Sequence, residues 1–121
     1  MAVARIVIIS CKKIKDVTCV SCMKCFKGMK EKVGEFARYE NQEIEVVAMG
    51  DCGDCPGLVL PKLALILDLA KVYDRDVDVI HLGTCILRAT GTAACPIKLE
   101  ELAGKIFGKF GKEVVIGTHP W

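Results

Sequence analysis

The residues of this chain best suited to chemistry are its cysteines. The 121 residues contain eight cysteines and two histidines. Cys52 and Cys55 are separated by two residues, the spacing that lets two thiolates chelate one metal ion. The same spacing after a strand is also typical of a dithiol redox pair. Gly53 permits the tight turn that either use requires. The pair therefore indicates a metal site or a redox site, without distinguishing between them.

A second group of cysteines lies nearer the beginning of the chain. Cys19, Cys22 and Cys25 are each separated by two residues, as at the start of a bacterial ferredoxin cluster-binding run. The fourth cysteine of such a run is missing, because Met29 occupies its position. A cluster bound here would have to take its fourth ligand from elsewhere in the chain.

Composition excludes several classes of protein. Seventeen basic and fifteen acidic side chains leave a net charge of +2, which argues against a nucleic-acid partner. A chain that is 52% hydrophobic can bury a core without disulfides. Arg5 interrupts the first apolar run and Asp68 lies within the longest one, so we expect neither a signal peptide nor a membrane span. These features predict a cytoplasmic protein with reduced thiols.

The hydrophobic pattern alternates between strands and helices. Four short β-branched runs predict strands at residues 3–9, 44–48, 77–82 and 114–116. Apolar stripes predict helices at about 23–38, 61–73 and 99–110, with Gly111 as the C-cap of the last. This order predicts one α/β domain over residues 1–121. We expect three layers, α/β/α, around a four-stranded parallel sheet in order 2-1-3-4, as in flavodoxin-like or Rossmann-like folds.

The predicted strands place ligand-type side chains at one edge of the sheet. Cys11 follows the first strand, Cys52 the second and Cys85 the third, while His119 follows the fourth. His81 lies at the end of the third strand. Ligands of open parallel sheets bind at the carboxyl ends of the strands. The sequence therefore predicts a shared site at this edge.

The remaining cysteines are expected in loops or helix starts that open on the same edge. Cys95 precedes the third helix, where the helix dipole favours a thiolate. The alternative is that cysteines fill the core as small hydrophobic residues, which would scatter them through strand interiors. None lies inside a predicted strand. His119 has its own alternative, a side chain in a tail without a ligand role.

These residues resemble the signatures of the CGGC domain family over nearly the whole chain. The family's Cys-Gly-Gly-Cys-Pro-Gly signature is similar to residues 52–57, with Asp54 in place of the second glycine. The further matches are Cys11 with Cys19, Cys25-Phe26-Lys27, Thr84-Cys85, Cys95-Pro96 and Thr118-His119. Cys22 is an additional cysteine. The resemblance implies a cysteine-rich metal-binding protein of the kind found mostly in anaerobic bacteria and archaea, and it supplies no substrate.

The favoured function is a metal site at the carboxyl edge of the sheet, holding an iron–sulfur cluster or a zinc ion. Thiolates select such metals over hard cations. The candidate ligands are Cys11, Cys19, Cys25, Cys52, Cys55, Cys85, Cys95 and His119. Among them we expect Cys11, Cys52, Cys55 and Cys85 to form the inner set, with Cys19, Cys95 and His119 at a second site or around the first.

Two other functions remain open. A thiol-disulfide oxidoreductase would use Cys52 and Cys55 as nucleophile and resolving thiol, but it leaves six cysteines unexplained. A purely structural zinc domain is weaker still, because so apolar a chain should fold without a metal. Whether the chain is an enzyme does not follow from its residues.

The helix expected over residues 61–73 carries more apolar surface than a sheet can cover. Only Lys62, Asp68 and Lys71 are polar from residue 62 to residue 73. A helix packed on one face of a sheet needs an apolar arc of only about 100° or somewhat more. Either neighbouring loops cover the excess, or the chain forms a homodimer through this helix.

Overall fold

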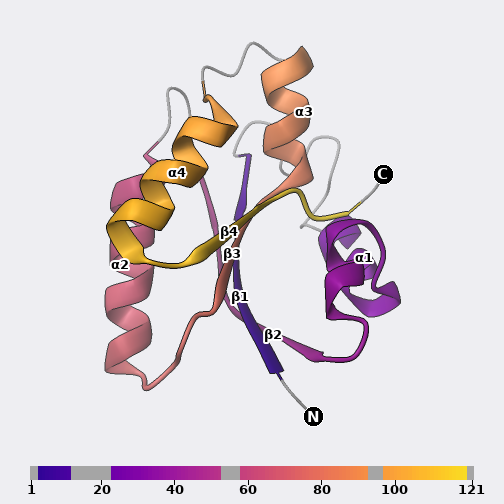
Figure 1. Cartoon of the computed structure of the whole chain (residues 1–121), viewed down its shortest axis with the longest axis horizontal. Coiled ribbons are helices and arrows are strands. Elements are labelled where there is room, and N and C mark those ends of the chain that lie inside the picture. Colours follow the sequence, from indigo (N-terminus) through magenta and orange to yellow (C-terminus); the bar gives the residue numbers. More distant parts are fainter. Residues whose placement is uncertain (1–2, 12–22, 53–57, 93–96, 120–121) are drawn as a thin grey trace.

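Four parallel strands form one sheet in the part of the chain that the computed structural model describes, residues 3–11, 23–52, 58–92 and 97–119 (Figure 1). The strands are β1 (Val3–Ser10), β2 (Glu43–Asp51), β3 (Val79–Leu82) and β4 (Glu113–Ile116). Their order is β2-β1-β3-β4, and each neighbouring pair is parallel. The predicted fold class and strand order are confirmed.

Helices cover both faces of this sheet. They are α1 (Met23–Glu31), the 3₁₀ helix η2 (Gly34–Tyr39), α2 (Val59–Val72), α3 (Thr84–Thr92) and α4 (Leu99–Phe110). Figure 1 shows α2 and α4 on one face and α1 on the other, with α3 beyond the carboxyl ends of the strands. No helix in the described residues is long and apolar enough to cross a membrane.

The helix predicted over residues 23–38 is wrong as a single element, because the chain forms α1 and then η2. Lys32 ends α1 in the left-handed region, at φ 52°, and the Val33 N–H bonds to the Gly28 carbonyl oxygen at 3.1 Å. This is the Schellman pattern, which closes a helix and redirects the chain. Phe36 continues the apolar stripe, but it reaches the core from η2.

Two further differences concern helix starts. The sequence pattern does not indicate a helix at α3, because its threonines and glycine are weak helix formers and it has no long apolar stripe. Helix α2 begins at Val59, two residues before the predicted start at Pro61. Proline is tolerated there because the first turn has no intrahelical partner for its missing N–H.

The pleat of the strands divides the core into two clusters. Val7 and Ile9 of β1 pack with side chains of α2 and α4, whereas Ile6 and Ile8 pack with α1 and η2. Successive residues of a strand point to opposite faces, so this alternation also decides which helices each residue after a strand will meet.

Candidate functional site

Each strand of the sheet is followed, within three residues, by a residue of the predicted site. Cys11 directly follows β1, Cys52 directly follows β2, and Cys85 and His119 each lie three residues beyond the last residue of β3 and β4. All four residues are buried. The register pairs Ser10 with Asp51, so the two residues that follow are also neighbours at the carboxyl edge. The edge predicted from the sequence therefore exists in the fold.

Three of the thiols lie on one face of the sheet. Cys11, Cys52 and Cys85 belong to the buried cluster on the α2 and α4 side. The backbone N–H of Cys11 donates a hydrogen bond to the Cys85 sulfur at 3.0 Å, which joins the end of β1 to the first turn of α3. An N–H aimed at sulfur favours the thiolate, the form in which cysteine binds metals and attacks electrophiles.

The backbone around Cys85 explains where its sulfur lies. Cys85 is the second residue of α3, and the Leu87 N–H bonds to the Gly83 carbonyl oxygen at the start of that helix. A Cβ on Gly83 would lie 3.1 Å from the Cys85 sulfur and 3.0 Å from the Ile9 carbonyl oxygen. Only glycine leaves this space, and the N-terminal end of α3 adds a favourable field for a thiolate.

Cys52 is fixed by the backbone of its neighbours. Its N–H bonds to the Ser10 carbonyl oxygen at 2.9 Å, and its own carbonyl oxygen accepts the Leu58 N–H at 2.6 Å. Cys52 and Leu58 therefore lie side by side at the end of β2. Asp51 forms an ion pair with Lys62 of α2 at 2.6 Å, which places a cation beside the thiol-bearing edge.

Cys25 and His119 belong to the opposite face. Cys25 of α1 lies in the cluster with η2, and its sulfur lies 3.4 Å from the Thr118 hydroxyl oxygen. A Cβ on Gly28 of α1 would lie 3.2 Å from His119 Cβ. The sheet thus separates Cys25 from Cys11, Cys52 and Cys85.

Two threonines at this edge, named above only as parts of family motifs, form hydrogen bonds to each other. The Thr84 N–H bonds to the Thr118 hydroxyl oxygen at 3.1 Å, and the Thr118 N–H bonds to the Thr84 hydroxyl oxygen at 2.9 Å. The Thr84 hydroxyl donates in turn to the His119 carbonyl oxygen at 2.7 Å. The repeated Gly-Thr pairs before Cys85 and His119 are the signal in the sequence that marks this reciprocal clamp.

His81, expected at the ligand edge, is a structural residue. Its ring lies 5.2 Å from the Phe36 ring, between centroids. Its Nδ1 lies 2.9 Å from the Gly117 carbonyl oxygen, which only accepts, so Nδ1 donates and Nε2 accepts the Tyr39 hydroxyl at 2.7 Å. Burial lowers the pKa of His81 below 6.5 and raises the pKa of Tyr39 to about 12. With both ring nitrogens bonded, His81 offers no donor to a metal.

The described residues supply part of the predicted ligand set. Within residues 3–11, 23–52, 58–92 and 97–119, no three His, Cys, Asp or Glu side chains are grouped closely enough to hold a metal ion. The predicted ligands Cys19, Cys55 and Cys95 lie outside the described residues, as does Cys22. Whether they complete the set with Cys11, Cys52 and Cys85 stays a prediction.

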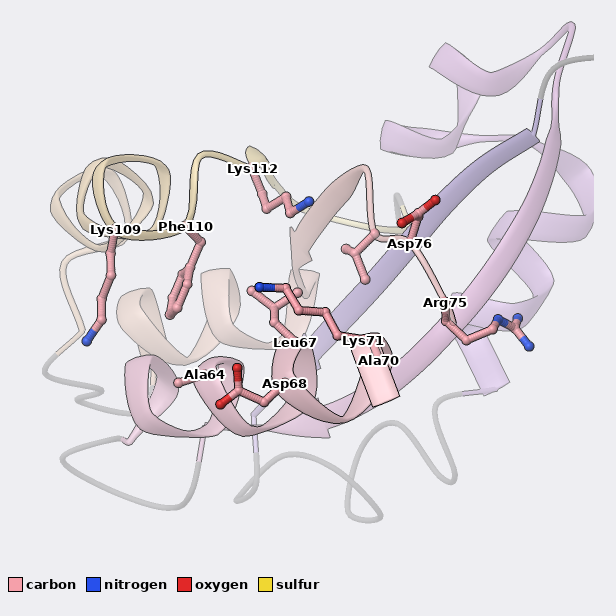
Figure 2. A pocket seen from close by; sticks show the side chains of 11 residues that line it. Ala64, Leu67, Asp68, Ala70, Lys71, Arg75, Asp76, Lys109, Phe110 and Lys112 are labelled. Atoms are coloured by element: carbon pink, nitrogen blue, oxygen red, sulfur yellow. The ribbon is translucent and has the colours of Figure 1, made fainter. Parts of the chain in front are cut away.

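A cavity of about 310 Å³ lies elsewhere, between the C-terminal halves of α2 and α4 (Figure 2). Lys71, Lys109 and Lys112 are among its lining residues, together with Asp68 and the ring of Phe110. No cysteine or histidine lines it in the described part of the chain. The thiols and this cavity are therefore separate features of the molecule.

Comparison with known families agrees with the arrangement of cysteines. The sequence profile of the CGGC domain family matches residues 5–119. The chain belongs to the CGGC domain family. The match runs from β1 to the residue that follows the Thr84–Thr118 clamp, so all the CGGC cysteines named above lie within it. No match to the chain is found among curated proteins or among solved structures.

Proposed function

We propose that this CGGC domain protein binds a metal centre, an iron–sulfur cluster or a zinc ion, through thiolates at the carboxyl edge of its sheet. Cys11, Cys52, Cys55 and Cys85 are the proposed ligands. Cys19, Cys95 and His119 are proposed for a second site or for positions around the first. The observation that carries the proposal is the burial of three thiols, from three adjacent strand ends, in one cluster on one face.

The chemistry of the donor set fits such a centre. Metal ligation requires deprotonated sulfur, and Cys85 receives both the Cys11 N–H and the N-terminal end of α3. Hydrogen bonds to sulfur also tune cluster potentials. Lys62 neutralises the Asp51 carboxylate, so this acidic residue adds no net negative charge beside the thiolates. When bound, a cluster would supply electron transfer, whereas a zinc ion would supply a Lewis acid.

The backbone explains why Cys55 is included. Cys52 and Leu58 are held together by a backbone hydrogen bond of 2.6 Å, and Cys55 is the midpoint of the sequence between them. Two residues separate Cys55 from Cys52, the spacing with which two thiolates chelate one ion. Cys25 is left out of the inner set because it packs on the other face, against Thr118.

Anaerobic purification of the full chain tests this function. We expect bound metal in stoichiometric amount, measured together with iron, acid-labile sulfide and the visible spectrum. A brown protein with sulfide identifies a cluster, and a colourless protein with zinc identifies a mononuclear site. A metal-free protein whose Cys52 and Cys55 cycle through a disulfide would contradict the proposal and favour the oxidoreductase alternative.

Serine substitutions test which cysteines bind the metal. The double variant Cys52→Ser, Cys55→Ser is expected to lose the metal. Substituting residues that only hydrogen-bond to metal ligands typically lowers metal affinity about 10- to 100-fold, and removing two ligands should lower it much further. Ile86→Val is the matched control, since it removes one methyl group from the same buried cluster without touching a thiol. Unchanged metal content in the double variant would show that the ligand assignment is wrong.

A further inference from the structure

The contact between Cys11 and Cys85 places two cysteines within reach of a covalent bond. The Cys85 sulfur lies 3.0 Å from the Cys11 backbone nitrogen. The N–Cα bond is about 1.46 Å long, so this sulfur lies within about 4.5 Å of the Cys11 Cα. In a disulfide, each sulfur is three bonds from the partner's Cα, so a sulfur this close to the Cα of the other cysteine meets a requirement of the bond. Rotation about the Cα–Cβ bond of Cys11 is the motion that brings its own sulfur toward that of Cys85.

The two thiols are not equivalent. Cys85 lies in the first turn of α3, and its sulfur accepts the Cys11 N–H. Both features favour the thiolate of Cys85, which is the attacking form in thiol–disulfide exchange. The absence of a side chain at Gly83 leaves the space in which this sulfur lies, at the end of β1 beside Cys11. Cys85 is therefore the nucleophile of the pair and Cys11 the resolving thiol.

We propose that Cys11 and Cys85 are a redox pair that is oxidised reversibly to a disulfide by small organic disulfides. The Cys85 thiolate attacks one sulfur of the small disulfide, whose S–S bond breaks and releases a thiolate that takes up a proton. Cys11 then gives up its proton, and its sulfur attacks Cys85 and releases the second small thiol. Two protein thiols are oxidised and one small disulfide is reduced to two thiols, so atoms and electrons balance.

This pair would also regulate the metal site, a consequence that rests on the proposed function. A Cys11–Cys85 disulfide removes two of the four proposed ligands, since a disulfide sulfur no longer carries the thiolate charge. Metal loading and pair oxidation then exclude each other. The reduced pair binds metal, and the oxidised pair releases it.

The experiment treats the reduced full chain with bis(2-hydroxyethyl) disulfide, a small neutral probe chosen because both residues are buried. We expect the chain to lose two hydrogen atoms and a peptide map to join Cys11 with Cys85, and dithiothreitol should reverse both changes. In Cys11→Ser, Cys85 should instead accumulate as a mixed disulfide with the probe. A map dominated by another pair, such as Cys11–Cys52 or Cys52–Cys55, would overturn the proposal.

Two controls separate geometry from thiol content. Cys25→Ser removes a buried thiol from the opposite face and should leave Cys11–Cys85 formation at the wild-type rate. Gly83→Ala keeps every thiol, but its Cβ would lie 3.1 Å from the Cys85 sulfur, so the rate should fall roughly tenfold or more. An unchanged rate in Gly83→Ala, with the variant folded by circular dichroism, would contradict the role of this contact.

Metal release is measured in parallel, so that failure of either proposal can be recognised. Release of metal in step with the Cys11–Cys85 disulfide supports both proposals. A disulfide in a chain that never contains metal supports the redox pair and contradicts the metal site. A metal-binding chain in which this disulfide never forms, even after a chelator has removed the metal, supports the metal site and overturns the redox pair.

Discussion

The imidazole of His81 is fully buried between Phe36 and Tyr39. Burial is the largest influence on it and lowers its pKa, because the charged ring would lose its hydration, and the Gly117 carbonyl oxygen opposes this only in part. A protonated ring would also present an N–H where Nε2 now accepts the Tyr39 hydroxyl. The native state therefore requires a neutral His81.

Acidification is expected to destabilise the fold through this residue. An unfolded histidine has a pKa of about 6.5. Between that value and the lower pKa of the folded state, the unfolded chain binds more protons, so the free energy of unfolding falls as pH decreases through 6.5. Urea denaturation from about pH 7.5 to about pH 5.5 measures this loss. His81→Gln does not titrate and should lose less stability over the same range; parallel curves would contradict this role of His81.

Three helices of the described chain end in the same way, with one residue in the left-handed region. These residues are Lys32 after α1, Asp74 after α2 and Gly111 after α4, at φ values of 52°, 54° and 67°. The Gly111 N–H bonds to the Phe107 carbonyl oxygen at 2.8 Å, which satisfies a carbonyl that the helix leaves open. The sequence predicts the C-cap at Gly111, but no glycine marks the ends at Lys32 and Asp74.

Gly108 inside α4 and Gly111 just after it should respond in opposite directions to the same substitution. Gly111→Ala places a Cβ at φ 67° and should lower the free energy of unfolding by about 1 kcal/mol. Gly108→Ala is the matched control, because it lies inside the helix with nothing within 4 Å of the added Cβ and should raise stability by about 0.5–1 kcal/mol. Urea denaturation of both variants checks this, and a change of the same sign in both would be inconsistent with it.

The elements that could be predicted from the sequence are those with a periodic pattern and a clear end. Ile6 to Ile9 is an uninterrupted buried run, and the connection rules of parallel sheets then narrow the possible strand orders to a few that include the observed one. The edge that carries Cys11, Cys52 and Cys85 follows from that order. The break after α1 could not be predicted, because Phe36 falls on the same apolar stripe whether the α-helix continues or a 3₁₀ helix follows it.

The finer arrangement of the site depends on tertiary structure. Cys25 lies in α1 and does not follow a strand, so the alternation along the strands does not assign it to a face, and its separation from Cys85 could not be predicted. The Cys11 N–H reaches the Cys85 sulfur only because α3 begins directly after Gly83. No apolar stripe marks the start of α3 in the sequence, so the contact between the Cys11 N–H and the Cys85 sulfur could not be predicted.

At the scale of the whole molecule, the buried thiols and the exposed apolar side chains of α2 lie in different parts of the described chain. The thiols lie at the carboxyl edge of the sheet, and α2 presents Leu65, Leu69 and Val72 outward, at 65%, 54% and 73% exposure. The three are spaced by four and three residues, as along the seam of two packed helices. Leu63 and Ala70, on the other side of α2, are buried. The described loops therefore do not cover the outer side of this helix.

We expect the protein to form a homodimer through α2, because a two-fold helix pair buries such a seam on both copies at once. Sedimentation at micromolar concentration should give a dimer for the wild type. The double variant Leu65→Lys, Leu69→Lys should give a monomer with an unchanged fold, since both side chains point outward. Leu87→Lys is the matched control, an exposed leucine of α3 away from the seam, and should remain dimeric. A wild-type chain that sediments as a monomer at this concentration would refute the expectation.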